Sequence, residues 1–359
     1  MKLSKKLKYK IFILILMYQK IFANGVWVNY GWEIFDYITD ARSSSLGNAN
    51  IAYNYEMPGS SLINPFIISN PKNYISITHQ SRYAGLFNND LIGFQINKFK
   101  TPIQINIFYQ GIGQIPDTRN MLLDWGVDGQ FVTNDLGEGN GILDEGERLD
   151  KNKLAFFTQK QFGLYSAFRR KILNRNFGIA FKLLGQNLNK HSALGIGLDI
   201  GFIKKIGNLD IAGTVKNLPA SGLIWDDGII EGSIAKFSIG GHYHKTIDKL
   251  PISFHLISKL CIDDNFNSNG ITSLNPELNN LIKKIHRSFG LETVYNNRLF
   301  IRIGRDIFYR STGGIGLYWN GFVLDYAFLG SFGTGLEGNH HLISINIEFE
   351  YFLSFISQL

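Results

Sequence analysis

Residues 322–328 read FVLDYAF and residues 341–351 read HLISINIEFEY, and these two stretches decide the fold. In both, apolar residues alternate with small or polar ones. The apolar set is Phe322, Leu324, Tyr326, Phe328, Ile343, Ile345, Ile347, Phe349 and Tyr351. Strands of about ten residues with one apolar and one polar face, ending in aromatics, are typical of membrane barrels. Because a half-buried soluble sheet shows the same alternation, the rest of the chain has to decide between the two.

The N-terminus favours the membrane. Residues 1–23 begin with five lysines, continue through the apolar run 11–18 and reach Ala23 before the chain turns polar, which predicts a secretory signal peptide. The run is shorter than the roughly 20 residues of a spanning helix, although a retained anchor is the alternative. No later segment has the length and hydropathy of a spanning helix, so an exported chain that enters a membrane must form a closed barrel.

The charge of the chain argues against nucleic-acid binding. The 36 basic and 29 acidic residues give +7, but six basic residues and no acidic ones lie in 1–23, which leaves 30 against 29. A nearly neutral chain carries no basic patch for DNA or RNA. The single cysteine, Cys261, excludes an intramolecular disulfide framework. No nucleophile motif, P-loop or dinucleotide fingerprint occurs, so nothing supports an enzyme.

About fourteen strands are predicted from period-2 segments bounded by turn residues. They lie near 74–82, 90–98, 102–111, 156–169, 176–186, 193–204, 208–217, 235–245, 251–261, 287–296, 298–306, 312–319, 322–330 and 341–351. An even number is what single-chain bacterial barrels require.

The connections between these strands sort by parity. Links from even to odd strands are short: 98–101, 172–176, 205–208, 246–250, 296–297 and 320–321. Links from odd to even strands include all the long ones: 112–155, 218–234, 262–286 and 331–340. Short turns on one side and long loops on the other are the asymmetry of outer-membrane barrels, and a soluble sandwich has no reason to show it.

The sequence therefore predicts an all-β protein, a transmembrane antiparallel outer-membrane barrel of about 14 strands over 74–359. Residues 24–73, rich in Asn, Gly, Ser and Pro, are expected to form an N-terminal plug in the lumen or the periplasm. The alternative is one or two additional strands, because 50–55 shows some alternation. The expected location is the outer membrane, in contact with its lipid.

Several motifs give the chain a resemblance to the PorV/PorQ family of FadL-like outer-membrane barrels. They are Ala41-Arg42-Ser43 with Leu46-Gly47 and Asn64-Pro65-Phe66, His79 with Tyr83-Ala84-Gly85, the glycine-rich run 193–201 with Asn217-Leu218, and the closing hairpin from Gly316 to Ser344. The Gly-Leu usual after the Asn-Pro dipeptide is absent. The order of the motifs over about 300 residues, rather than any one of them, makes the resemblance specific.

The resemblance implies two activities. PorV-type proteins act in type IX secretion, where they receive cargo proteins at the translocon. FadL-like proteins pass hydrophobic small molecules or fatty acids through a plugged lumen. The sequence favours protein secretion or cargo handling slightly, because of its long outer loops, with the hydrophobic channel as the alternative and a purely structural or adhesive surface barrel as a third.

The loop at 112–155 carries the site-like chemistry. Oxygen-bearing residues alternate with glycines over 124–150, and the candidate Ca²⁺ ligands are Asp128, Asp135, Glu138, Asn140, Asp144 and Glu147. Hard oxygen ligands on an irregular backbone suit calcium, although the spacing is not that of an EF-hand. The alternative is a solvated acidic loop.

Other polar residues are expected to have ordinary lumenal or loop roles. His242 and His244 share one strand face, whereas His340 and His341 point apart, so neither pair is favoured as a metal site. A hydrated lumen is expected around Asp199, Asp210, Lys216, Asp325, Glu348 and Glu350.

Overall fold

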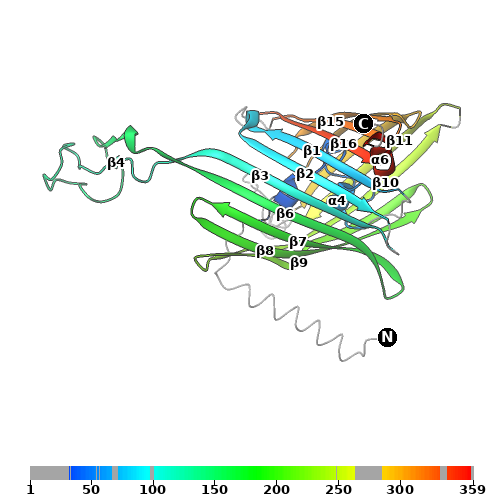
Figure 1. Cartoon of the computed structure of the whole chain (residues 1–359), viewed down its shortest axis with the longest axis horizontal. Helices are drawn as coiled ribbons and strands as arrows, with labels where there is room; N and C mark the ends of the chain where they lie inside the picture. Colours follow the sequence, from blue (N-terminus) through cyan, green and yellow to red (C-terminus); the bar gives the residue numbers. More distant parts are fainter. Residues whose placement is uncertain are drawn as a thin grey trace, which may run out of the picture.

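The computed structural model describes residues 32, 34–53, 55, 57–66, 72–97, 101–247, 249–262, 285–331 and 338–356. Fourteen strands close into one antiparallel barrel (Figure 1), in the order β1-β16-β15-β14-β13-β12-β11-β10-β9-β8-β7-β6-β3-β2. Their bounds are β1 Tyr74–Arg82, β2 Phe87–Ile96, β3 Ile103–Asp117, β6 Ala155–Ile172, β7 Arg175–Leu188, β8 His191–Ile206, β9 Leu209–Trp225, β10 Ile230–Ile247, β11 Ile252–Ile262, β12 Ile285–Tyr295, β13 Leu299–Arg305, β14 Ser311–Trp319, β15 Phe322–Leu329 and β16 His340–Glu348. The predicted fold class is confirmed.

The alternation of the sequence maps onto the two faces of the wall. On β15, Leu324 is 47% exposed on the outside whereas Asp325 is 2% exposed on the inside. The same pattern continues on β16, where Ile343 faces out and Ser344 faces in. An apolar exterior on a closed barrel is the form in which strands cross a bacterial outer membrane, because every backbone hydrogen bond is made within the wall.

The short connections are tight turns. Asn174, Asn297 and Asn320 all adopt positive φ in the links β6–β7, β12–β13 and β14–β15. Asparagine tolerates this left-handed conformation, which two-residue hairpin turns require. The predicted turns at 172–176, 296–297 and 320–321 are therefore confirmed.

Two predicted boundaries are wrong. The loop predicted at 218–234 is mostly strand, since β9 runs to Trp225 and β10 starts at Ile230. Register shifts between Ile234 and Lys236 break the period-2 pattern there, so the strands could not be followed in the sequence. β3 likewise extends to Asp117, so the long connection after it covers 118–154.

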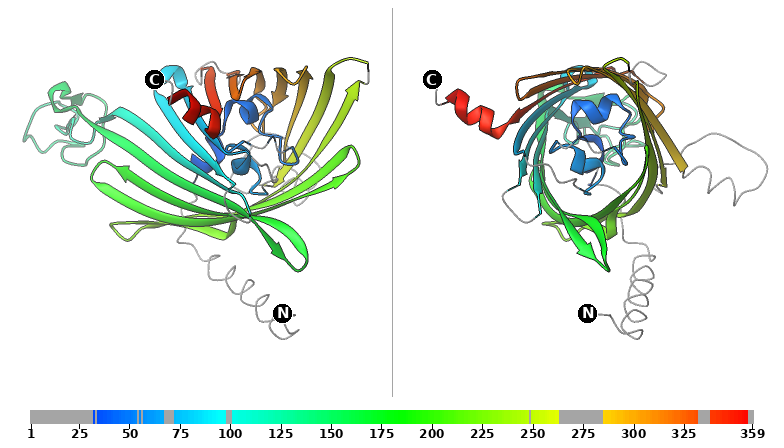
Figure 2. Two further views of the ribbon diagram at one scale, coloured as in Figure 1. Left: turned by 45° about the vertical axis from the view of Figure 1, so that its right-hand side comes forward. Right: turned by 90° about the vertical axis from the view of Figure 1, so that its right-hand side faces the viewer.

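The last strand ends at Glu348, earlier than predicted. Its partner β1 begins at Tyr74, opposite Glu348, so the backbone beyond has no neighbour in the wall. The chain instead satisfies its backbone groups in a helix, α6 Phe349–Ile356, which lies outside the barrel (Figure 2). Glu350 belongs to this helix and is exposed, so its expected place in the lumen is wrong.

The described residues between 32 and 66 lie inside the barrel (Figure 2) and form three short helices, α2 Ile34–Tyr37, α3 Ala41–Ser45 and α4 Ser60–Ile63. We call residues 32–66 the lumenal segment. Asp40 caps α3 by accepting a 2.7 Å hydrogen bond from the Ser43 backbone N–H. The described residues within 50–55 lie outside any strand.

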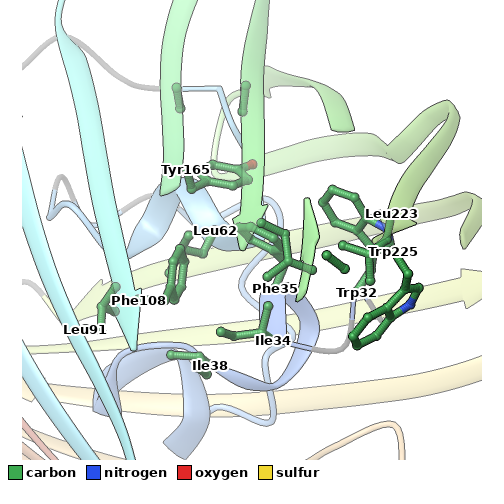
Figure 3. Packing of buried hydrophobic residues seen from close by; sticks show 14 residues of the cluster. Trp32, Ile34, Phe35, Ile38, Leu62, Leu91, Phe108, Tyr165, Leu223 and Trp225 are labelled. Atoms are coloured by element: carbon green, nitrogen blue, oxygen red, sulfur yellow. The ribbon is translucent and has the colours of Figure 1, made fainter. Parts of the chain in front are cut away.

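An apolar cluster joins the lumenal segment to one side of the wall (Figure 3). Phe35 of α2 packs edge-on against Phe108 of β3, with ring centroids 5.3 Å apart, and Trp32 stacks on Phe35 at 5.6 Å. Tyr165 and Leu223 close the cluster from β6 and β9, and both are almost fully buried. Burial of such aromatic rings gives the segment a fixed position against this side of the wall.

Glycines let the segment approach the wall closely. A Cβ at Gly178 of β7 would lie 2.2 Å from backbone atoms of Pro65 and Phe66. A Cβ at Gly47, where φ is +63°, would lie 2.3 Å from the carbonyl oxygen of Arg305. Only glycine fits at these two contacts.

The predicted signal peptide at 1–23 and most of the loop at 262–286 lie outside the described residues. No helix in the described part of the chain is both long and apolar enough to cross a membrane.

Candidate lumenal site

A buried network of charges ties the lumenal segment to strands β12, β13 and β15. Arg42 of α3 donates to both carboxylate oxygens of Glu292, at 3.0 and 2.7 Å. Arg302 donates to Glu292 at 2.5 Å and to Asp325 at 2.6 Å. These four residues, which we call the charge network, balance two guanidinium groups with two carboxylates. Bidentate, fully buried pairs of this kind fix orientation as well as position.

Aromatic rings extend the charge network toward a chain of histidines. Tyr53 donates to Glu292 at 2.6 Å, and its ring stacks on those of His242 and His255, with centroids 4.3 and 4.8 Å away. His242 in turn bonds Asp210 at 3.1 Å and His255 at 2.9 Å. The two strand histidines thus form part of the surface on which the lumenal segment is seated.

On the neighbouring strands β9–β11, the charged contacts of the lumenal segment use lysines. Lys236 of β10 donates to Asp36 of α2 at 2.6 Å, and Lys216 of β9 lies 3.8 Å from the same carboxylate. Burial alone would raise the pKa of Asp36, but the two ammonium groups outweigh it and hold that pKa at about 2. Lys259 of β11 donates to the backbone oxygen of Asn48 at 2.6 Å.

A cavity of about 250 Å³ lies between this side of the lumenal segment and the wall. The cationic side chains that line it are Arg82, Lys216, Lys236, Lys259 and Arg310. The carboxylates are Asp36 and Asp306, so the described lining carries five cations and two anions. Apolar and aromatic side chains complete it: Trp32, Tyr37, Ile63, Ile307, Phe308 and Leu329. The cavity is therefore amphipathic and cation-rich.

One end of the cavity reaches the side of the barrel that carries the long connections. Arg82 is the last residue of β1, Leu329 is the last of β15, and His340 is the first of β16. Residues 306–310, from the link between β13 and β14, close this end. This part of the lining is therefore the part nearest to the long connections.

Residues 118–154 form a lobe that projects beyond the barrel, held by the short pair β4 Leu122–Leu123 and β5 Arg148–Leu149 (Figure 1). Its carboxylates bond the backbone of the loop. Glu138 accepts from the N–H groups of Val132, Thr133 and Asn134, and Glu147 accepts from those of Gly126 and Asp144. Among the residues that the structure describes, no group of three or more His, Cys, Asp or Glu side chains is arranged to hold a metal ion.

The six candidate calcium ligands all lie in this lobe. Asp135 accepts from the backbone N–H of Asp128 at 2.8 Å, Asp128 accepts from that of Gln130 at 2.8 Å, and the Asn140 amide donates to Asp144 at 2.7 Å. These contacts give the acidic side chains a role in shaping the glycine-rich loop. Calcium binding stays a prediction.

Of the lumenal residues expected from the sequence, Asp199, Asp210 and Asp325 are buried inside the barrel. Asp199 pairs with Lys182 at 2.7 Å, and His340 faces inward while His341 is exposed, as predicted. Sequence reasoning missed Glu292, Arg302 and the cations of the cavity. A signal was present, because the tight turn after Tyr295 fixes a register that places Glu292 directly opposite Arg302.

No protein-family model and no curated protein matches the sequence. Solved structures similar to the chain include the Pseudomonas putida toluene transporter TodX (TM-score 0.43, 11% identity, covering 90% of this chain and 98% of TodX). Another is the Acinetobacter baumannii outer membrane protein Omp33 (TM-score 0.38, 5% identity, covering 77% of this chain and 97% of Omp33). The assignment of the fold rests on the closed strand pairing itself, which makes the chain an antiparallel barrel of the outer-membrane kind.

Proposed function

We propose that this protein is an outer-membrane channel that passes small, partly hydrophobic molecules, with the lumenal segment as its plug. The observation that carries the proposal is the amphipathic cavity between the lumenal segment and the wall. Ligand sites combine apolar walls with a few placed polar groups, and this lining does so inside a closed barrel. TodX, which is described as a toluene transporter, agrees with this choice but does not carry it.

The lumenal segment would have to shift for a molecule to pass. It is tied to the wall first by the charge network on β12–β15 and by the apolar cluster, whose wall residues come from β2, β3 and β6–β9. The second set of contacts, those of Asp36 and Asn48 with β9–β11, lies between these two. The second set is smaller, and it borders the cavity. Passage is therefore expected along the cavity side, with the charge network as the fixed side of the plug.

A tether tests this directly. The backbone N–H of Ala41 donates to the Ser344 hydroxyl at 2.8 Å, so cysteines at both positions, in a Cys261→Ser background, would bond α3 to β16. Purified barrel in lipid vesicles is expected to pass benzyl alcohol faster than empty vesicles do. The oxidised Ala41→Cys/Ser344→Cys variant should keep most of that flux, because the new bond joins α3 to β16 on the fixed side of the plug.

The single variant Ala41→Cys is the control and should be insensitive to oxidation. Flux no greater than that of empty vesicles for the untethered protein would contradict the channel. Loss of flux on oxidation that returns on reduction would contradict the assignment of the α3 end of the segment as the fixed side.

A second candidate function, protein secretion or cargo handling of the PorV/PorQ type, is favoured by the lobe at 118–154. It exposes large apolar side chains, among them Phe131 at 73% and Leu136 at 85%. Contiguous exposed apolar residues mark interaction surfaces more often than inert ones. Purification from outer membranes with mass spectrometry of bound proteins tests it, since secretion requires translocon or cargo proteins to be recovered with the barrel.

A further inference from the structure

We propose that the lumenal cavity binds small carboxylates that carry an aromatic ring, which names the substrate class for the passage proposed above. Three features of the lining point to this class: an excess of cations, aromatic rings beside them, and a small volume.

Three residues account for the excess of cations: Lys216, Lys259 and Arg82. Lys216 comes no closer than 3.8 Å to a carboxylate oxygen of Asp36, whose other oxygen accepts from Lys236 at 2.6 Å. Lys259 bonds a backbone carbonyl rather than a carboxylate. Arg82 is 8% exposed, and its Nε atom is buried without a hydrogen-bond partner in the described structure.

A buried cation without a close anion is costly, and an anionic ligand would offset that cost. The two carboxylates on the lining have partners already, since Asp306 pairs with Arg310 at 2.7 Å and Asp36 with Lys236. Arg82, Lys216 and Lys259 thus remain to receive an anion. A carboxylate suits them because it accepts charge-assisted hydrogen bonds from guanidinium and ammonium groups on two oxygens.

Aromatic rings lie next to Arg82 and elsewhere on the cavity lining. The guanidinium of Arg82 lies 5.1 Å from the ring centroid of Tyr37, and Tyr37 stacks on Phe308 at 5.7 Å. Trp32 lines the same cavity. Flat rings are favoured partners for such surfaces, and the volume of about 250 Å³ limits the ligand to a small one.

Calorimetry on the purified full-length barrel in detergent, with benzoate and its neutral counterpart benzyl alcohol, tests the proposal. Benzoate is expected to bind at least about tenfold more tightly, the effect of one charge-assisted hydrogen bond. Arg82→Gln and Lys259→Gln should each weaken benzoate binding about tenfold and leave benzyl alcohol nearly unchanged. Lys205→Gln, at an exposed position near the end of β8, is the matched control and should bind as the original does.

Arg82→Lys keeps the charge and should restore part of the affinity lost in Arg82→Gln, which separates charge from folding. Equal affinity for the two ligands, or no heat with millimolar benzoate, would overturn the proposal. So would Arg82→Gln and Lys259→Gln variants that bind benzoate like the Lys205→Gln control.

Vesicle flux separates this inference from the channel itself. If benzyl alcohol passes but benzoate neither binds nor passes, the channel stands and the carboxylate site fails. If benzoate binds but neither compound crosses vesicles faster than in the absence of protein, the site stands and the channel fails.

Discussion

The two sides of the lumenal segment differ in the balance of buried positive and negative side chains where they meet the barrel wall. On the β12–β15 side, Arg42 and Arg302 face Glu292 and Asp325 at hydrogen-bond distances, and the charges balance. On the β9–β11 side, the cavity lining carries Lys216, Lys236 and Lys259, and the carboxylate bonded there is that of Asp36. The balanced side is complete without a ligand, whereas the cation-rich side is not. From this difference we infer that the balanced side holds the segment in place and that the cation-rich side contacts the molecules that pass.

Removing the central carboxylate should have the largest effect. Glu292→Ala would leave Arg42 and Arg302 buried without their shared partner, and breaking a buried ion pair costs about 3–5 kcal/mol. Urea unfolding of the refolded barrel in vesicles measures the loss.

Two variants make the loss at Glu292 specific. Lys259→Ala, on the cation-rich side, removes a charge that bonds a backbone oxygen and has no carboxylate partner among the described residues, so it should cost far less. Asp117→Ala breaks a pair with Arg119 that water screens, and it should have little effect on stability. If Lys259→Ala destabilised the barrel as much as Glu292→Ala, the contrast between the two sides would be lost.

The strands could be predicted from the sequence because two physical requirements leave a visible pattern in it. Lipid outside and polar groups inside force the alternation seen in Leu324 and Asp325, and tight turns require residues such as Asn297 and Asn320. The extension of β9 to Trp225 was missed because a register shift interrupts the alternation. Helix α6 was missed because Phe349 and Tyr351 continue the apolar pattern after the wall has ended.

The site was harder to predict because it depends on pairings between distant residues. Arg42 lies 250 positions before Glu292 in the sequence, and nothing local to either residue joins them. The pairing of Glu292 with Arg302 could have been predicted, because one tight turn sets the register of the two strands. The surroundings of the cavity lysines could not be predicted, because Lys216 and Lys236 meet Asp36, and Lys259 meets the backbone of Asn48, only once the segment is placed in the lumen.

A glycine substitution can test how tightly the charge network is packed. A Cβ at Gly316 of β14 would lie 2.2 Å from Asp325 and 2.7 Å from Arg302, so Gly316→Ala should push the charge network apart. Overpacking of this kind costs about 1–3 kcal/mol in urea unfolding. Gly222→Ala on β9, where nothing lies within 4 Å, is the control and should be nearly neutral. Equal losses for the two would mean that the network tolerates repacking.

On the cation-rich side, acid should loosen the segment. The pKa of Asp36 is about 2, below its ordinary value of 3.8, so its stabilisation is complete above pH 4 and lost as pH falls toward 2. The difference between these two pKa values corresponds to at most about 2 kcal/mol of folding stability, because the carboxylate is 26% exposed and partly screened. Stability measured between pH 6 and pH 2.5 should fall less steeply in Asp36→Asn, which already lacks the contribution at neutral pH. Identical slopes would place the acid sensitivity elsewhere.

The smallest effect is expected in the lobe, outside the comparison of the two sides. We propose that Ca²⁺ binds between carboxylates of residues 124–150, with Asp128, Asp135, Glu138, Asn140, Asp144 and Glu147 as candidate ligands. The carboxylates already accept backbone hydrogen bonds, as Glu138 does from three N–H groups, so a metal would compete with these contacts and bind weakly. Calorimetry with CaCl₂ should show uptake that is reduced in Asp135→Asn/Asp144→Asn and unchanged in Asp227→Asn, an exposed aspartate of another loop. Absence of heat at millimolar metal would leave the carboxylates with a purely architectural role, capping the backbone of a lobe whose glycines alone would not hold its shape.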